Sequence, residues 1–233
     1  MANYVLVAGA WLGSWAWDRV VPGLREAGHG AYPLTLSGLA DRTGEPAGQQ
    51  THVQDVVDEV LRHDLHEVVL VGHSYAGIPV GQAAARLGDR LSRVVFLDSN
   101  IPGEGESFVS QWPGGGGAAV AAAIEAHSGF WPPLGAADYE GQGLAEADIA
   151  EIVSRSTPHP GATLTEPAVM ASPLGGLPAT YVKCTLDGYE PFDAVLELVA
   201  GPNWSLAKLD AGHWPMFSEP QALVGLLLDE AAQ

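Results

Sequence analysis

Apolar residues along this chain follow two alternating patterns, short continuous runs and stretches spaced three and four residues apart. The runs predict strands at residues 4–8, 31–34, 67–71, 93–97, 179–184 and 205–209. The spaced stretches predict helices at 14–28, 51–61, 75–87, 118–127, 145–155, 192–199 and 219–231. Because strands and helices alternate, we expect an α/β fold with a mostly parallel, doubly wound sheet covered by helices on both faces.

The alternation stops between residues 98 and 177 and resumes after them. This stretch is rich in proline, contains the glycine run Gly114–Gly117, and holds only two short amphipathic segments. We interpret residues 1–97 and 178–233 as one core and residues 98–177 as a helical lid insertion. The glycines could hinge a mobile lid or form an idle surface loop, and the sequence leaves both open.

The segment with the clearest chemistry is Val68-Val69-Leu70-Val71-Gly72-His73-Ser74-Tyr75-Ala76-Gly77. A buried strand leads into small residues around one serine, and an alanine-rich helix follows. That layout is a nucleophile elbow, a tight turn that pushes the serine hydroxyl out of the carboxyl edge of the sheet. Ser74 is therefore the candidate nucleophile, and we assign His73 a packing or elbow-supporting role.

A serine hydroxyl needs a base and a group that orients the base. His213 follows the last predicted strand and lies in a turn between Gly212 and Pro215, so we expect it to be the base. For the orienting acid we favour Asp187, which follows the strand before last. The alternatives are Asp98, which follows the strand ending at residue 97, and Glu190 or Asp193.

Negative charge that develops on a substrate carbonyl needs hydrogen-bond donors. The backbone N–H groups of Ala10 and Tyr75 are the candidates for this oxyanion hole, because Ala10 lies in a glycine-rich loop and Tyr75 begins a helix. The aromatic residues near the catalytic segments or in the insertion are candidates for an apolar substrate pocket. They are Trp11, Trp112, Phe130, Trp131 and Trp214.

The composition of the chain limits which partners and cofactors we expect. The 233 residues include 28 acidic and 10 basic side chains, a net charge of −18, which argues against nucleic acid and anionic membranes as partners. The single cysteine, Cys184, excludes an internal disulfide and favours a cytoplasmic location. Zinc-type spacings, a phosphate-binding loop and a dinucleotide fingerprint are all missing, so we expect no metal and no cofactor. The oligomeric state is left open.

Three stretches carry a family resemblance: the opening VLVAGAWLGSWAW, the pair TLSGLADR and THVQDVVDEVL, and the ending LDAGHWPMFSEP. They resemble the α/β-hydrolase superfamily, and within it the branch of plant methyl esterases, hydroxynitrile lyases and bacterial pyrethroid- or salicylate-type esterases. The resemblance implies the α/β-hydrolase fold, with Ser74, His213 and Asp187 as triad and Ala10 and Tyr75 as oxyanion donors. This chain departs from it in having Ala8 where the family usually has histidine.

The resemblance also bears on the reaction. Cyanohydrin-cleaving members carry a lysine after the catalytic histidine and a threonine in the first loop, where this chain has Trp214 and Gly9. We therefore expect a serine hydrolase that cleaves a small, neutral, hydrophobic carboxylic ester or lactone through an acyl-enzyme. The alternatives are a non-hydrolytic enzyme on the same fold (a lyase, an isomerase or a lactone-forming tailoring enzyme) and a non-catalytic small-molecule receptor.

Overall fold

A computed structural model describes residues 1–112 and 115–231, and across these residues six strands form one sheet in the order β2-β1-β3-β4-β7-β8. Every neighbouring pair is parallel. The strands are β1 (Asn3–Val7), β2 (Gly30–Leu34), β3 (Val68–His73), β4 (Leu91–Leu97), β7 (Ala179–Cys184) and β8 (Trp204–Leu209). The six predicted strands are thus confirmed, with ends that move by up to two residues.

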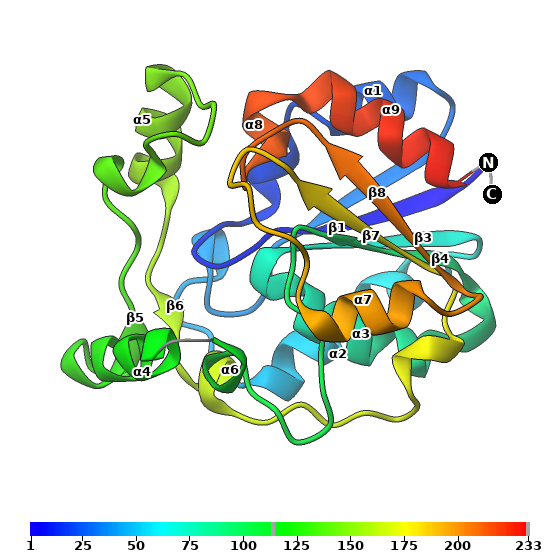
Figure 1. Ribbon diagram of the computed structural model, residues 1–233. Helices are drawn as coiled ribbons and strands as arrows, with labels where there is room; N and C mark the ends of the chain where they lie inside the picture. The colour runs from blue at the N-terminus through cyan, green and yellow to red at the C-terminus, as the bar shows by residue number, and fades with distance from the viewer. Residues whose placement is uncertain (113–114, 232–233) are drawn as a thin grey trace.

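Helices cover both faces of this sheet (Figure 1). On one face lie α1 (Val21–Glu26), α8 (Pro215–Ser218) and α9 (Pro220–Ala231), and on the other α2 (Gln49–Arg62), α3 (Gly77–Leu87) and α7 (Asp193–Val199). Buried side chains form one apolar cluster on each side, because successive residues of a strand point to opposite faces. The predicted α/β fold, with a mostly parallel sheet covered by helices on both faces, is confirmed.

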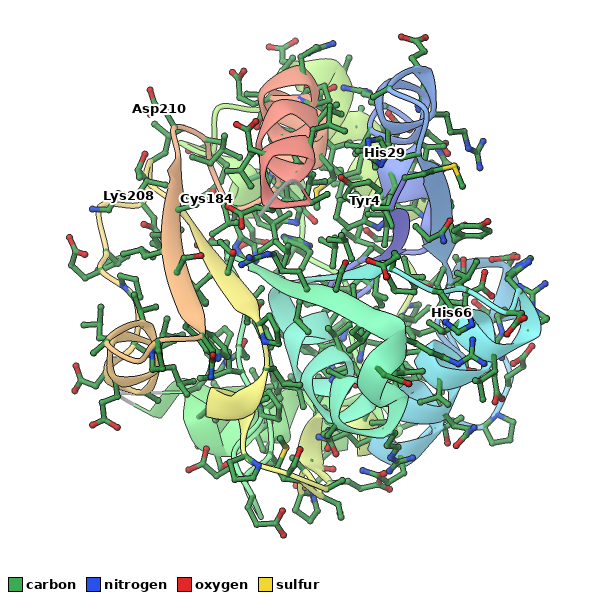
Figure 2. The ribbon with its side chains drawn as sticks, turned by 90° about the vertical axis from the view of Figure 1, so that its right-hand side faces the viewer. Tyr4, His29, His66, Cys184, Lys208 and Asp210 are labelled. Carbon is green, nitrogen blue, oxygen red and sulfur yellow. The ribbon has the colours of Figure 1, made fainter. Side chains whose placement is uncertain are left out.

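Side chains differ between β1, an interior strand of the sheet, and β8, one of its two edge strands. Tyr4 of β1 lies beneath α9, where its hydroxyl donates to the Leu227 carbonyl at 2.9 Å and its ring meets His29 edge-on (Figure 2). On the β8 side, Lys208 and Asp210 are exposed (Figure 2). A charged edge strand discourages pairing with another sheet.

Two helix starts differ from the sequence-based expectation. The helix expected from residue 14 begins as a 3₁₀ turn, Ser14–Trp17, and continues as the separate helix α1. Helix α2 begins at Gln49 rather than at Thr51, and the Thr51 hydroxyl accepts the Gly48 N–H at 3.2 Å. Thr51 therefore supports the helix from inside its first turn, a role that the sequence pattern does not separate from that of the N-cap.

The structure explains why a proline, Pro79, is tolerated within the helix predicted at residues 75–87. A short 3₁₀ turn, Ser74–Ala76, precedes α3, so Pro79 is the third residue of the α-helix; its side chain is buried. N–H groups in the first turn of a helix have no intrahelical acceptor, and a proline there removes no helical hydrogen bond.

The described part of the insertion, residues 98–177, contains α4 (Gly116–Ala126), α5 (Glu146–Arg155) and α6 (Ala162–Thr165). The strands β5 (Phe130–Trp131) and β6 (His159–Pro160) form a small antiparallel ribbon. The part of the insertion that carries α4, α5, β5 and β6 lies beyond the carboxyl ends of the strands, toward which the arrowheads of β7 and β8 point (Figure 1). Of the glycine run, Gly114 lies outside the described residues, and Gly116 begins α4.

None of the helices in the described part of the chain combines the length and the apolar character needed to span a bilayer.

Candidate active site

Ser74 directly follows β3 and is the first residue of the 3₁₀ turn that precedes α3, with φ of 55°. Two glycines permit this turn. A Cβ on Gly9 would lie 2.7 Å from the Ser74 Cβ, and a Cβ on Gly77 would lie 2.0 Å from the Asn100 carbonyl oxygen. Only glycine fits at either place, since real Cβ atoms do not approach other atoms so closely. The strained serine is what a nucleophile elbow requires.

His213 faces Ser74 across the carboxyl edge of the sheet, and its Nε2 lies 2.9 Å from the Ser74 Oγ. Its backbone is held from two directions. The His213 N–H donates to the Gln142 Oε1 at 2.8 Å, and the His213 carbonyl accepts from the His73 Nε2 at 2.7 Å. The contact between Ser74 and His213 is therefore already within hydrogen-bond distance, and two further segments hold His213 there.

The acid that contacts His213 is Asp98. Its Oδ2 lies 2.6 Å from the His213 Nδ1, and its Oδ1 accepts from Lys183 Nζ at 2.8 Å and from the Cys184 N–H at 3.2 Å. Asp98 directly follows β4, the strand beside β3, and adopts φ of 42°, which turns its backbone away from the extended path of the strand. The side chains of Ser74, His213 and Asp98 thus form one connected row.

The sequence-based choice of Asp187 as the orienting acid is wrong for this geometry. Its Oδ2 accepts from Lys183 Nζ at 2.8 Å and its Oδ1 from the Tyr189 N–H at 3.0 Å. The second bond closes a turn onto Gly188, which has φ of 72°. Lys183 therefore lies between the two carboxylates, and only Asp98 reaches the imidazole. Glu190 borders the cavity beside this turn, and Asp193 begins α7.

His213 and Lys183 together explain how the buried carboxylate of Asp98 stays charged. Burial by itself would raise the pKa of Asp98, but hydrogen bonds and charge interactions with His213 and Lys183 outweigh it and lower that pKa to about 2. Burial also opposes the charge on Lys183, and its bonds to Asp187 and Asp98 raise its pKa above the usual value. Asp98 is therefore ionised across the neutral range and can stabilise a protonated His213.

The row of polar groups opens into a cavity of about 550 Å³. Four of the five aromatic residues expected in the pocket line it: Trp11, Trp112, Trp131 and Trp214. Phe130 does not line it, and this expectation is corrected. Phe130 and Trp131 are neighbours in β5, where alternate side chains point to opposite sides, so Trp131 faces the cavity and Phe130 is 43% exposed. Phe108, Leu134 and Phe192 add further apolar walls.

The two candidate oxyanion donors belong to two segments near Ser74. Ala10 lines the cavity, and the Tyr75 N–H follows the serine at the start of the 3₁₀ turn. Ala8 is buried where the resemblance leads us to expect a histidine, and two other histidines support this loop instead. The Gly9 N–H donates to the His73 Nδ1 at 3.3 Å and the Trp11 N–H to the His159 Nδ1 at 3.2 Å.

Several contributors to the site carry no sequence signal that identifies them, above all Gln142 and His159 of the insertion. Lys183 does have such a sequence signal, because a lysine within an apolar strand is buried and needs a carboxylate to pair with. Among the described residues no group of three or more histidine, cysteine, aspartate or glutamate side chains is arranged to hold a metal ion.

The buried histidines predict a loss of stability in mild acid. Burial lowers the pKa of His52 to about 4 and that of His73 to about 3, against about 6.5 in an unfolded chain. Below pH 6.5 these two histidines become protonated in the unfolded chain but stay neutral in the folded protein. The free energy of unfolding that they support above pH 6.5 is therefore lost as the pH falls toward their folded-state pKa values. At pH 5 each of the two histidines lowers the free energy of unfolding by about 2 kcal/mol relative to neutral pH.

Urea unfolding at pH 7.5 and pH 5 measures this effect, with His52→Gln as the control that removes one titrating ring. His52 Nε2 donates to the Ser37 carbonyl at 2.8 Å, and a glutamine amide can make the same bond. Between pH 7.5 and pH 5 the free energy of unfolding of the wild type should fall by about 2 kcal/mol more than that of the variant. Equal losses would contradict the assignment of a neutral His52.

Comparison with known proteins places this architecture in a family. Residues 4–226 match the model of the alpha/beta hydrolase family. The chain is 32% identical to a carbendazim hydrolyzing esterase of a Nocardioides species, over 96% of this chain and 97% of that one. It is 27% identical to methylesterase 3 of Arabidopsis thaliana, over 98% and 95% of the two chains.

The fold also matches that of an extracellular alpha/beta-hydrolase from a Paenibacillus species, with a TM-score of 0.86, 20% identity and 99% of each chain covered. The protein therefore belongs to the alpha/beta hydrolase family. The resemblance to the branch that holds plant methyl esterases is confirmed with it.

Proposed function

We propose that the protein is a carboxylic ester hydrolase in which Ser74 is the nucleophile, His213 the general base and Asp98 the acid that orients it. The observation that carries the proposal is the unbroken row from Ser74 Oγ through His213 to Asp98, with contacts of 2.9 and 2.6 Å. The row ends in an apolar cavity of about 550 Å³, large enough for a small ester. Its named esterase relatives support the same class of reaction.

The reaction would proceed in two halves. His213 Nε2 takes the proton of the Ser74 hydroxyl as the oxygen attacks the ester carbonyl, and the resulting imidazolium passes that proton to the departing alcohol. An acyl group then remains on Ser74 Oγ. In the second half His213 takes a proton from water, the hydroxide attacks the acyl carbonyl, and the proton returns to Ser74 as the acid leaves.

The carbonyl oxygen becomes negatively charged in both halves. We propose the N–H groups of Ala10 and Tyr75 as its donors, because Ala10 borders the cavity and Tyr75 begins the turn that follows Ser74. Among the described residues the Ala10 N–H has no acceptor in the protein, so it is available to a substrate. Backbone donors need no reorganisation when the charge appears, which makes them effective in a site of low polarity.

The charges around the cavity favour a neutral, apolar substrate. Lys183 is the cation among the described lining residues, and both Asp98 and Asp187 already engage it. Glu190 borders the same space with no cation bonded to its carboxylate among the described contacts. A substrate that carries its own carboxylate would therefore meet net negative charge, and aromatic side chains form most of the remaining wall.

We propose that the insertion acts as the lid of this site. It contributes Phe108, Trp112, Trp131 and Leu134 to the cavity wall, and its Gln142 holds the backbone of His213. If the insertion shapes the substrate pocket, larger aryl and acyl groups should be bound better than an acetyl group.

A series of neutral methyl, aryl and lactone esters tests the proposal, compared with half-esters of matched length that carry a free carboxylate. We expect hydrolysis of the neutral esters, with kcat/KM rising as the apolar group grows. The half-esters should react at least about five-fold more slowly, since one like charge at short range costs about 1–4 kcal/mol. Tight binding without turnover would instead indicate a receptor, and equal rates for both series would contradict the substrate class.

A further inference from the structure

Trp11, the residue after the candidate oxyanion donor Ala10, is held in an unusual backbone conformation. Its φ is 66°, in the left-handed region that bulky residues avoid. Such strain persists only where surrounding contacts enforce it. The loop carrying Ala10 and Trp11 must therefore be fixed by something outside its own sequence.

The insertion supplies that restraint through three hydrogen bonds to Trp11. The Trp11 N–H donates to the His159 Nδ1 at 3.2 Å, and the Trp11 carbonyl accepts from the Thr157 N–H at 3.0 Å. The Trp11 indole Nε1 donates to the Trp131 carbonyl at 3.1 Å. His159 is the one side chain among these partners, and it is fully buried.

The hydrogen bonds of His159 determine which of its nitrogens carries the proton. Thr163 Oγ1 donates to the Pro160 carbonyl at 2.7 Å, so it can only accept from the His159 Nε2, which lies 2.8 Å away. The Nε2 therefore carries the hydrogen, and the Nδ1 presents a lone pair to the Trp11 N–H. Burial first, and the nearby His52 second, lower the pKa of His159 well below its usual value, so the ring stays neutral.

The neighbouring bonds leave one N–H free. The Gly9 N–H is accepted by His73 and the Trp11 N–H by His159, while the Ala10 N–H between them has no acceptor among the described residues. Successive peptide groups held on both sides cannot rotate independently. The direction of the Ala10 N–H therefore depends on both rings.

We infer that His159 is a positioning residue of the reaction: from the insertion, it accepts the Trp11 N–H and thereby aims the Ala10 N–H at the carbonyl oxygen attacked by Ser74. The inference rests on the proposed ester hydrolysis. It makes the insertion part of the oxyanion machinery as well as part of the pocket wall. His159 touches no reacting atom in this arrangement and acts only through the loop.

The variants His159→Asn and His159→Leu form a matched pair that tests the inference. Their side chains have the same shape, and an asparagine Oδ1 takes the place of the Nδ1 acceptor, which leucine lacks. In His159→Leu we expect kcat to fall by about 10- to 100-fold, somewhat less than the loss of a whole oxyanion donor, while KM changes by less than about three-fold. The affinity for a trifluoromethyl ketone, which forms a tetrahedral adduct, should fall by the same factor. His159→Asn should stay within about three-fold of the wild type.

The outcomes separate this inference from the proposed function. If the wild type shows no turnover that depends on Ser74, the proposed function fails. If the wild type is active and His159→Leu keeps its kcat, or if both variants lose equally, His159 does not act as the acceptor and the inference is overturned. Should His159→Leu fail to fold, His159→Phe retains the ring volume without an acceptor and serves in its place.

Discussion

Replacing Ser74 by alanine should lower kcat by about 10⁶, because removal of the nucleophile leaves only binding and oxyanion stabilisation. A continuous assay on a neutral aryl ester measures the loss, and Ser154→Ala, an exposed serine on α5, is the control. The hydroxyl of Ser74 lies 2.9 Å from the base, whereas Ser154 bonds only the Glu151 carbonyl of its own helix. The control should therefore keep full activity.

The proposed covalent step can be tested directly in the same proteins. A fluorophosphonate should add one phosphonyl group to the wild type and to Ser154→Ala, and none to Ser74→Ala, as read by intact mass. Undiminished ester hydrolysis by Ser74→Ala would rule out the acyl-enzyme mechanism. An active wild type that never forms an adduct would point to a non-hydrolytic reaction that uses His213 alone.

The second large effect distinguishes the two carboxylates beside Lys183. Asp98→Asn should lower kcat by about 10⁴, since the amide keeps the shape of the side chain but cannot stabilise a protonated His213. Asp187→Asn should cost less than about ten-fold, because Lys183 then still pairs with Asp98 at 2.8 Å. Steady-state kinetics on one neutral ester, with both variants checked for folding, makes the comparison. The reverse order of losses would show that Asp187 reaches His213 in the working enzyme.

The pairing also explains why two carboxylates and a lysine occur together at this edge. A buried carboxylate without a cation would become protonated or destabilise the fold. His213 and Lys183 together offset the burial of Asp98 and lower its pKa to about 2, so Asp98 is charged at neutral pH. Asp187 in turn engages the remaining side of the ammonium group.

Much of the site could be predicted from local patterns. The elbow around Ser74 is encoded by a buried strand, small residues and a following helix, all within ten positions, and the loop that carries His213 follows the last strand. The choice between Asp98 and Asp187 was not local. Both follow neighbouring strands, β4 and β7, at the same edge, and only the backbone turn at Asp98 and the reach of Lys183 distinguish them.

In the insertion too, local sequence predicts the helices but not their contacts with the rest of the protein. Its two longer helices follow from their apolar spacing, and α4 and α5 lie close to the expected ranges. Its contacts with the core were not predictable, because Gln142 and His159 meet their partners across 71 and 148 positions of the chain. Phe130 shows why the pocket residues were only partly predictable. The sequence shows that residue 130 is aromatic, but not which side of the two-residue strand β5 faces the cavity.

By itself the sequence determined the sheet with its covering helices, the serine at the elbow and the histidine that faces it, because hydrophobic periodicity and turn chemistry act over a few residues. The tertiary structure decided which carboxylate meets the imidazole, which aromatic side chains face the cavity and which rings hold the loop at Ala10. Those outcomes depend on distances between segments far apart in the chain. Packing sets these distances, and no local pattern records them.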